Sequence, residues 1–300
     1  MNINEKISQL KKERTHLQIT GGIIMLLLIL CFGLIIWQPL YGMILFAVLI
    51  LVYILPVRTM LKRYQVHIKQ VTFEESLRSK LKEIRYLEKD GMSRQELADM
   101  HFPPVERPNV SLIKDTIRGT YQAKPVILAE ITTDFNQFKE TGSGKDRSYI
   151  DYLSGCLFDL TLSGDTGLQC MIWPSGLLSQ ESLALYYPDF KSESSADHVT
   201  MDAEEVNRLD QKYFLLIKKG TSSEKANDRL IKEYLHLDDY TPDHAALQIS
   251  GNHLRIFIRN RFLYNRKVPV RSEIDPRFLT YNEFSEINPI LRIADAVMHL

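Results

Sequence analysis

An uninterrupted apolar stretch constrains this chain more than any other feature of its sequence. From Leu17 to Val57 the chain contains no Asp, Glu, Lys, Arg or His. Residues 19–37 and 40–57 are each about as long as a helix that crosses the roughly 30 Å hydrocarbon core of a bilayer. Pro39 lies between them and lacks the backbone N–H that a continuous helix needs. The pattern predicts a transmembrane helical hairpin.

Basic residues on both sides of the hairpin predict its orientation. They are Lys6, Lys11, Lys12 and Arg14 before it, and Arg58, Lys62, Arg63 and Lys69 after it. The turn between the spans carries no charge, so the positive-inside rule places both chain ends in the cytoplasm and the protein in the inner (plasma) membrane. Because no charged residue lies within the spans, the hairpin is typical of an anchor rather than of an ion pathway.

Two alternatives to the hairpin stay open. The apolar runs could be a pair of core helices in a soluble protein, although soluble helices rarely have this composition over two full spans. The first run could also be a cleaved signal peptide. That alternative fits less well, because the run is long, no small-x-small cleavage site follows it, and a second apolar run comes directly after it.

The sequence divides the chain into four parts. They are a cytoplasmic N-terminal segment (1–16), the hairpin (17–59), a helical connector (60–104) and a cytoplasmic domain (105–300). Residues 1–16 fit an amphipathic helix and a frayed polar start equally well. In the connector, a broken apolar stripe predicts a helix from Met60 to Asp90, and Ser93-Arg94-Gln95-Glu96 has the pattern of a capping box that opens a short helix.

Strand patterns dominate the chain after Asp115. Three hairpins are predicted: Thr116–Tyr121 with Pro125–Thr132, Asp151–Leu162 with Leu168–Trp173, and Ala246–Ser250 with His253–Ile258. Further expected elements are a strand at Tyr213–Lys218, a helix from Ser222 or Ser223 to Leu235, a closing helix at Phe284–Leu300, and an irregular segment at 174–198. Strands without regularly interleaved helices favour an α+β fold with a mostly antiparallel sheet.

Composition and motifs exclude several function classes. The net charge is zero, so bulk attraction to nucleic acid is not expected. The three cysteines lack metal-type spacing, and Cys156 and Cys170 are expected to be buried free thiols on a reducing side of the membrane. Gly142-Ser143-Gly144-Lys145 resembles a phosphate loop, but Lys139 stands where the first glycine belongs and Asp146 follows the lysine. No cofactor is therefore expected.

The densest group of metal-ligand side chains lies in one short segment. Its candidate metal ligands are His236, Asp238, Asp239, Asp243 and His244. Imidazoles and carboxylates bind divalent cations, so the segment could serve a metal-dependent hydrolase. The alternative is a polar loop in which Asp239 and Asp243 act as turn residues beside Pro242.

A basic run follows near the last predicted hairpin. Its members are Arg255, Arg259, Arg261, Arg266, Lys267 and Arg271. On an extended strand Arg255 and Arg259 share one face. One hypothesis is contact with anionic lipid headgroups, and the alternative is pairing with the acidic region Asp197–Glu205.

Several short segments carry a family resemblance. They are Asp115–Gly119, Pro125–Glu130, Tyr152–Phe158, Tyr213–Leu216 and the closing Phe278–Leu300. With the order of two spans, helical connector and β-rich domain, they resemble the bacterial membrane proteins grouped as domain-of-unknown-function family 3137. The chain departs from that pattern at Leu153-Ser154. The family has no assigned activity, so the resemblance implies a fold and a membrane location but no functional residues.

These observations predict a membrane-anchored, cytoplasm-facing protein. Its expected partners are membrane lipid and a protein, and its expected role is non-catalytic interaction or scaffolding. The metal-dependent hydrolase and the anionic-lipid sensor are the alternative functions.

Overall fold

The computed structural model describes residues 2–89, 91–139, 147–192, 203–220, 228–264, 274–280 and 284–299. The chain forms two compact units. The first is built from the described residues of Met1–Ser79 and Asn265–Asn282, and the second from those of Lys80–Tyr264 and Glu283–Leu300. The first unit therefore ends within the segment that the sequence assigns to a helical connector.

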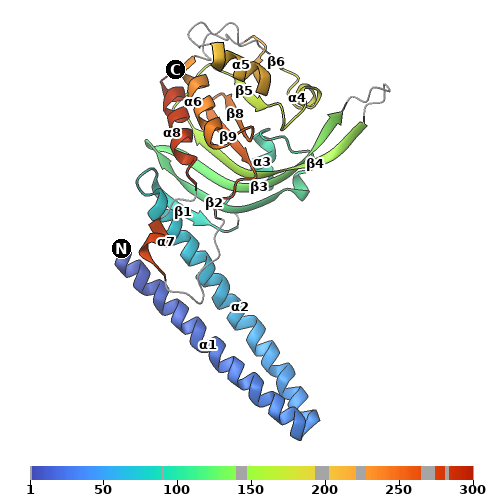
Figure 1. Cartoon of the computed structure of the whole chain (residues 1–300), viewed down its shortest axis with the longest axis vertical. Coiled ribbons are helices and arrows are strands. Elements are labelled where there is room, and N and C mark those ends of the chain that lie inside the picture. The colour runs from blue at the N-terminus through green and yellow to red at the C-terminus, as the bar shows by residue number, and fades with distance from the viewer. Residues whose placement is uncertain are drawn as a thin grey trace. The chain divides into compact units, whose positions relative to one another are not determined.

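Two long helices make up most of the first unit (Figure 1). Helix α1 spans Ile3–Trp37 and helix α2 spans Pro39–Leu77. The amphipathic N-terminal segment continues without a break into the first span, which favours the helical alternative for residues 1–16. Pro39 occupies the first helical position of α2, where its missing N–H costs no hydrogen bond. The helices approach closely at Gly42, since a Cβ there would lie 2.6 Å from the Ile35 backbone.

The apolar parts of both helices are exposed. Only 6% of the most apolar window of α1 and 7% of that of α2 are buried inside the structure. A pair of core helices in a soluble protein would bury these side chains, whereas Ile29 is 66% and Ile36 87% exposed. Both helices are long and apolar enough to cross a membrane, and they indicate membrane association.

The charged ends of the two helices are joined by packing and ion pairs. A small core contains Ile7, Leu10, Tyr64, Ile68 and Val71 together with Ile274 and with Leu279 of helix α7 (Pro276–Thr280). Lys6 Nζ lies 2.7 Å from Glu74 Oε2 and 2.8 Å from Glu75 Oε1. This end of the hairpin is thus a folded structure rather than two independent rods.

The second unit contains an antiparallel sheet of nine strands in the order β1-β2-β3-β4-β9-β8-β5-β7-β6 (Figure 1). The strands are β1 Lys82–Leu87, β2 Leu112–Tyr121, β3 Lys124–Lys139, β4 Arg147–Thr161, β5 Cys170–Pro174, β6 Phe190–Ser192, β7 Tyr213–Lys218, β8 Ala245–Ser250 and β9 His253–Arg259. The helical elements are α3 Arg94–Asp99, η1 Pro108–Val110, α4 Gln180–Tyr186, α5 Ala203–Lys212, α6 Asp228–Tyr240 and α8 Ile287–Met298. The α+β fold predicted from the sequence is confirmed.

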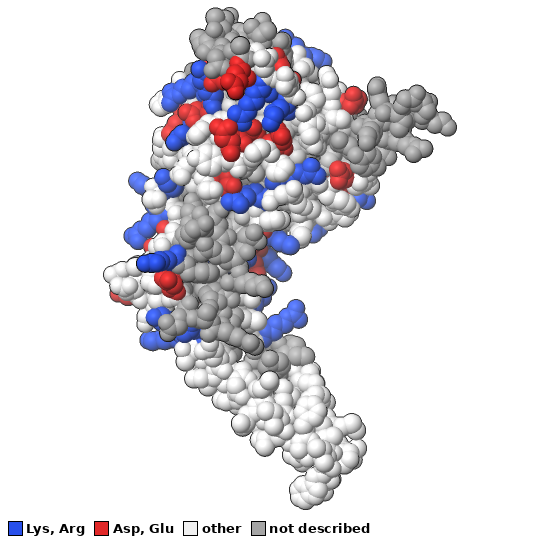
Figure 2. Space-filling model, viewed as in Figure 1, with Lys and Arg blue, Asp and Glu red and all other residues white. Residues whose placement is uncertain are grey.

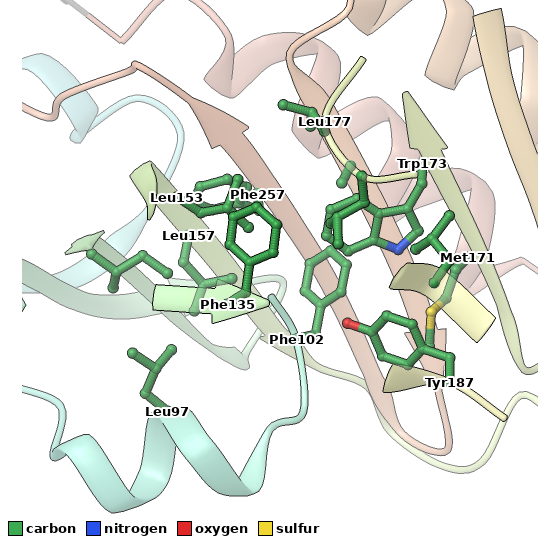
Figure 3. Close-up of a cluster of buried hydrophobic side chains, with 14 of the residues drawn as sticks. Leu97, Phe102, Phe135, Leu153, Leu157, Met171, Trp173, Leu177, Tyr187 and Phe257 are labelled. Atoms are coloured by element: carbon green, nitrogen blue, oxygen red, sulfur yellow. The ribbon is translucent and has the colours of Figure 1, made fainter. Parts of the chain in front are cut away.

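One face of the sheet carries a hydrophobic core that includes helix α3 (Figure 3). Leu157 of β4, Phe257 of β9 and Trp173 of β5 project toward Leu97 of α3 and toward Phe102. The Phe102 and Trp173 rings meet edge to face with centroids 5.4 Å apart. This core fixes α3 over the sheet and so positions the polar residues described below.

The predicted helix from Met60 to Asp90 is wrong in its second half. Helix α2 ends at Leu77, and Lys82–Leu87 is a strand that pairs with β2. Tyr86 of this strand is buried and its hydroxyl donates to Asp115 Oδ1. Long-range pairing and burial override the helix propensity of the local sequence here.

The second predicted hairpin is also wrong, although both of its strands exist. Strands β4 and β5 do not pair with each other, because the β8–β9 hairpin lies between them. Every residue of β5 is buried, as expected for a strand inside the sheet. Such a uniformly apolar strand does not indicate which strands pair with it. The first and third predicted hairpins, the strand Tyr213–Lys218 and the short helix after Ser93 are confirmed.

Two further expectations are confirmed only in part, and others lie outside the described residues. The segment predicted as irregular contains helix α4 and strand β6 up to Ser192. Helix α6 ends at Tyr240 rather than Leu235, and its predicted caps Ser222 and Ser223 lie outside the described residues. Residues 140–146, which include most of the phosphate-loop-like sequence, lie outside them as well.

Candidate functional site

A row of polar side chains crosses the α3-covered face of the sheet. Arg118 on β2 pairs with Ile127 on β3, which pairs with Asp159 on β4. Asp159 in turn pairs with Arg255 on β9, and Arg255 pairs with Gln248 on β8. Directly paired residues point to the same face with Cβ atoms about 5 Å apart. The register therefore gathers residues from five strands.

Asp159 is the centre of this row. Its carboxylate is 5% exposed, accepts a 3.1 Å hydrogen bond from Arg255 Nε, and lies 3.1 Å from His253 Nδ1. Arg255 Nη1 also donates to Gln248 Oε1 at 2.9 Å and to the Met100 carbonyl at 3.0 Å. Because buried charges must be paired, these contacts hold the guanidinium in one position.

Helix α3 supplies the acidic side of the site. Ser93 caps the helix, and the Ser93 backbone N–H donates to Glu96 Oε2 at 2.6 Å. This hydrogen bond, with a smaller effect of Arg118, lowers the pKa of Glu96. Arg118 Nη2 lies 3.6 Å from Glu96 Oε1, and Arg118 Nε donates to the Gly91 carbonyl at 2.8 Å. The capping box that the sequence predicts thus also orients a residue of the cleft.

An open cleft of about 560 Å³ lies between α3 and the sheet. It is lined by Glu96, Asp99, Met100, Arg118, Gly119, Pro125, Val126, Ile127, Asp159, Thr161, His253 and Arg255. Acidic and basic groups alternate over a partly apolar floor. Such a surface can form ion pairs and hydrogen bonds with a polar segment of mixed charge. Of these residues the sequence named only Arg255 as a candidate site residue, because the row forms only when five separate strands pair.

Three of the candidate metal ligands, His236, Asp238 and Asp239, contact other protein groups through their side chains. Arg208 of α5 donates to Asp238 Oδ2 at 2.6 Å and lies 2.9 Å from Asp239 Oδ1. Asp238 Oδ1 accepts the Asp243 backbone N–H at 2.8 Å, and His236 Nδ1 lies 3.6 Å from Asp239 Oδ2.

His244, the fifth candidate, donates its backbone N–H to the Thr241 carbonyl at 3.1 Å. Within the described ranges, no group of three or more His, Cys, Asp or Glu side chains is arranged to hold a metal ion. The segment works as a junction between α5 and α6, and this geometry gives the hydrolase alternative no support.

The basic run is divided by the fold. Arg255 pairs with Asp159, Arg261 Nε lies 2.9 Å from Glu286 Oε1, and Arg259 is half-buried on β9. The described ion-pair partners of Arg255 and Arg261 are Asp159 and Glu286, and most of the alternative partner region Asp197–Glu205 lies outside the described residues. The last three members of the run, Arg266, Lys267 and Arg271, lie outside the described residues.

The cysteines behave as expected from the sequence. Cys156 and Cys170 are free and buried, and burial raises the pKa of each thiol, that of Cys170 to about 12. A raised pKa keeps a thiol protonated and therefore unreactive.

Comparison with protein-family models, with curated proteins and with solved structures finds no match to this chain. The resemblance to domain-of-unknown-function family 3137 therefore stays a prediction.

Proposed function

We propose that this chain is a membrane-anchored interaction module whose sheet unit binds a partner on the cytoplasmic side. The exposed, charge-free surface of α1 and α2 carries the proposal. Exposing so many apolar side chains to water costs free energy, and a bilayer would bury them. The basic residues at the open end of the hairpin support cytoplasmic termini and two membrane crossings.

The uncharged end of the hairpin supports the same orientation. Figure 2 shows no Lys, Arg, Asp or Glu over the distal part of the hairpin. Trp37 and Tyr41 flank the turn and are 81% and 65% exposed. Such rings favour the headgroup region of a bilayer, so they mark where the turn would emerge on the far side.

The cleft beside α3 is the proposed surface for the partner. Asp159 and Arg255 fix each other by an ion pair, and the α3 cap fixes Glu96. These side chains therefore lose little conformational entropy when a partner binds. Its mixed charge fits a polar protein segment better than a purely anionic ligand. Anchoring would raise the effective concentration of this surface toward partners at the same membrane.

Cysteine labelling tests the topology. The native cysteines are buried, so single exposed cysteines introduced by Lys11→Cys, Tyr41→Cys and Asn252→Cys can be compared with the parent chain. An impermeant maleimide should label Tyr41→Cys on intact cells, and the other two only after permeabilisation. Labelling of Asn252→Cys on intact cells would refute the proposed orientation.

Photo-crosslinking tests the cleft. A photoreactive residue at His253, which lines the cleft, should give a discrete crosslinked product in membranes. The same residue at the exposed Asp165 serves as the control. Arg118→Ala should weaken the His253 crosslink and leave membrane insertion unchanged. Equal crosslinking from both positions would contradict binding in the cleft.

A further inference from the structure

A second pocket lies within the first unit, between α1 and α2. It has a volume of about 310 Å³. Its lining residues are Glu13, His16 and Leu17 from α1, and Met60, Arg63, Tyr64 and His67 from α2. Small-ligand pockets usually measure about 300–1,000 Å³, so this one is large enough for a compact polar group.

The pocket lies where the charge-free part of each helix ends. Leu17 is the first residue of the charge-free stretch, and Arg58 is the first charged residue after it. When the apolar stretch lies in hydrocarbon, this level of the hairpin lies among the lipid headgroups. Leu17 and Met60 line the apolar side of the pocket, and His16 and Arg63 line its polar side.

The polar side of the pocket has a defined geometry. His67 Nδ1 lies 2.9 Å from Glu13 Oε1, so this pair closes one wall. Tyr64 is only 2% exposed and forms part of the interior, and its burial raises the pKa of its hydroxyl to about 12. His16 and Arg63 are exposed and reach the rim.

The surrounding charge favours an anion. The basic residues of this level are Lys11, Lys12, Arg14, Arg58, Lys62, Arg63 and Lys69. Glu13 is the single acidic residue in 11–16, and 58–69 contains none. Each Lys or Arg close to a membrane surface attracts anionic lipid by about 1 kcal/mol, and basic pockets between membrane helices bind anionic headgroups.

We propose that this pocket binds the phosphate-bearing headgroup of one anionic phospholipid. Arg63 and His16 contact the phosphate oxygens, and the acyl chains follow the exposed apolar surface that begins beside Leu17. The proposal rests on the membrane insertion proposed above and deepens it, because it changes the hairpin from a passive anchor into a lipid-selective one. It also places lipid recognition outside the Arg255–Arg271 run, in which Arg255 and Arg261 are already paired internally.

Lipid retention tests the proposal on the full-length chain. The protein is reconstituted with equal parts of phosphatidylcholine and phosphatidylglycerol, extracted in mild detergent and analysed by native mass spectrometry. One retained phosphatidylglycerol per chain is expected. Arg63→Ala should lower its retention about fivefold, the effect of one lost basic contact. The matched control is Arg78→Ala, an exposed arginine of the same unit that does not line the pocket, which should leave retention unchanged.

Three outcomes would overturn the lipid site: equal retention of neutral and anionic lipid, equal loss in Arg63→Ala and Arg78→Ala, or displacement of the lipid by millimolar inorganic phosphate. Flotation of the same samples on liposomes separates this failure from failure of the proposed anchor. A chain that floats with vesicles without selecting anionic lipid refutes the pocket alone. A chain that stays soluble without detergent or vesicles refutes the anchor as well.

Discussion

Removing the Asp159 carboxylate is the most direct test of how the cleft is held together. Asp159→Ala deletes the acceptor for Arg255 Nε and the contact with His253. The Asp159 side chain is 5% exposed and that of Arg255 11%, so little water can replace the lost partner. The guanidinium would stay nearly buried with only Gln248 and the Met100 carbonyl as acceptors.

The expected magnitude follows from that geometry. Breaking a buried ion pair by removing one partner costs about 3–5 kcal/mol, and the two remaining acceptors reduce this to about 2–3 kcal/mol. Asp159→Asn keeps the volume and one acceptor oxygen, so its cost should be about 1 kcal/mol. Combining Asp159→Leu with Arg255→Met removes both charges, and the double variant should be less destabilised than the sum of the single changes by about 1–3 kcal/mol.

Tryptophan fluorescence provides the assay. The chain has two tryptophans: Trp173 is fully buried in the sheet unit and Trp37 lies exposed in the hairpin. In a Trp37→Phe background, urea unfolding of the detergent-solubilised full-length protein therefore reports on the sheet unit alone. The free energies come from the midpoints and slopes of these transitions.

Two results would refute this reasoning. The first is a cost below about 0.5 kcal/mol for Asp159→Ala, which is the range of ordinary surface substitutions. The second is strict additivity in the Asp159–Arg255 double-mutant cycle, because residues in contact should be coupled.

Three further predictions test other parts of the fold. Gly155→Ala should destabilise the sheet by more than about 2 kcal/mol in the same fluorescence assay, because a Cβ would lie 2.0 Å from a carbonyl oxygen of β9. Lys6→Met should lower the stability of the hairpin end by about 1–2 kcal/mol, measured by circular dichroism in detergent, since Glu75 is only 7% exposed. Burial lowers the pKa of Lys6, but its hydrogen bonds to Glu74 and Glu75 have a larger effect, so the pKa is raised. The stability that protonated Lys6 contributes to the hairpin end should therefore be complete below pH 10.5 and lost at higher pH. The lowered pKa of Glu96 predicts that α3 loses stability at low pH. Amide-exchange protection of α3 should be complete above pH 4.5 and fall at lower pH. The variant Glu96→Gln should abolish this pH dependence.

The sequence predicted several elements correctly because adjacent residues determine them. The α3 capping box, the turn at Gly251-Asn252 and the break at Pro39 each depend on a few adjacent residues. The wrong predictions concern elements that depend on residues far away in the sequence. Lys82–Leu87 is a strand because β2 offers it a pairing edge, and no nearby residue encodes that edge.

The candidate sites divide in the same way. Side-chain type alone selected His236–His244 and Arg255–Arg271, but it did not reveal that Arg208 engages two carboxylates of the first group or that Asp159 and Glu286 engage two arginines of the second. Those partners are distant in sequence, so only the folded chain brings them together.

The sequence by itself determined the apolar hairpin and the α+β class, because helix length, hydropathy and strand periodicity act over neighbouring residues. The tertiary structure alone decided the strand order, the polar row from Arg118 to Gln248 and the pocket between α1 and α2. Each of these depends on the register between segments far apart in the chain. Register is set by burial of whole faces at once, and a one-residue slip would turn every side chain of a strand to the other face.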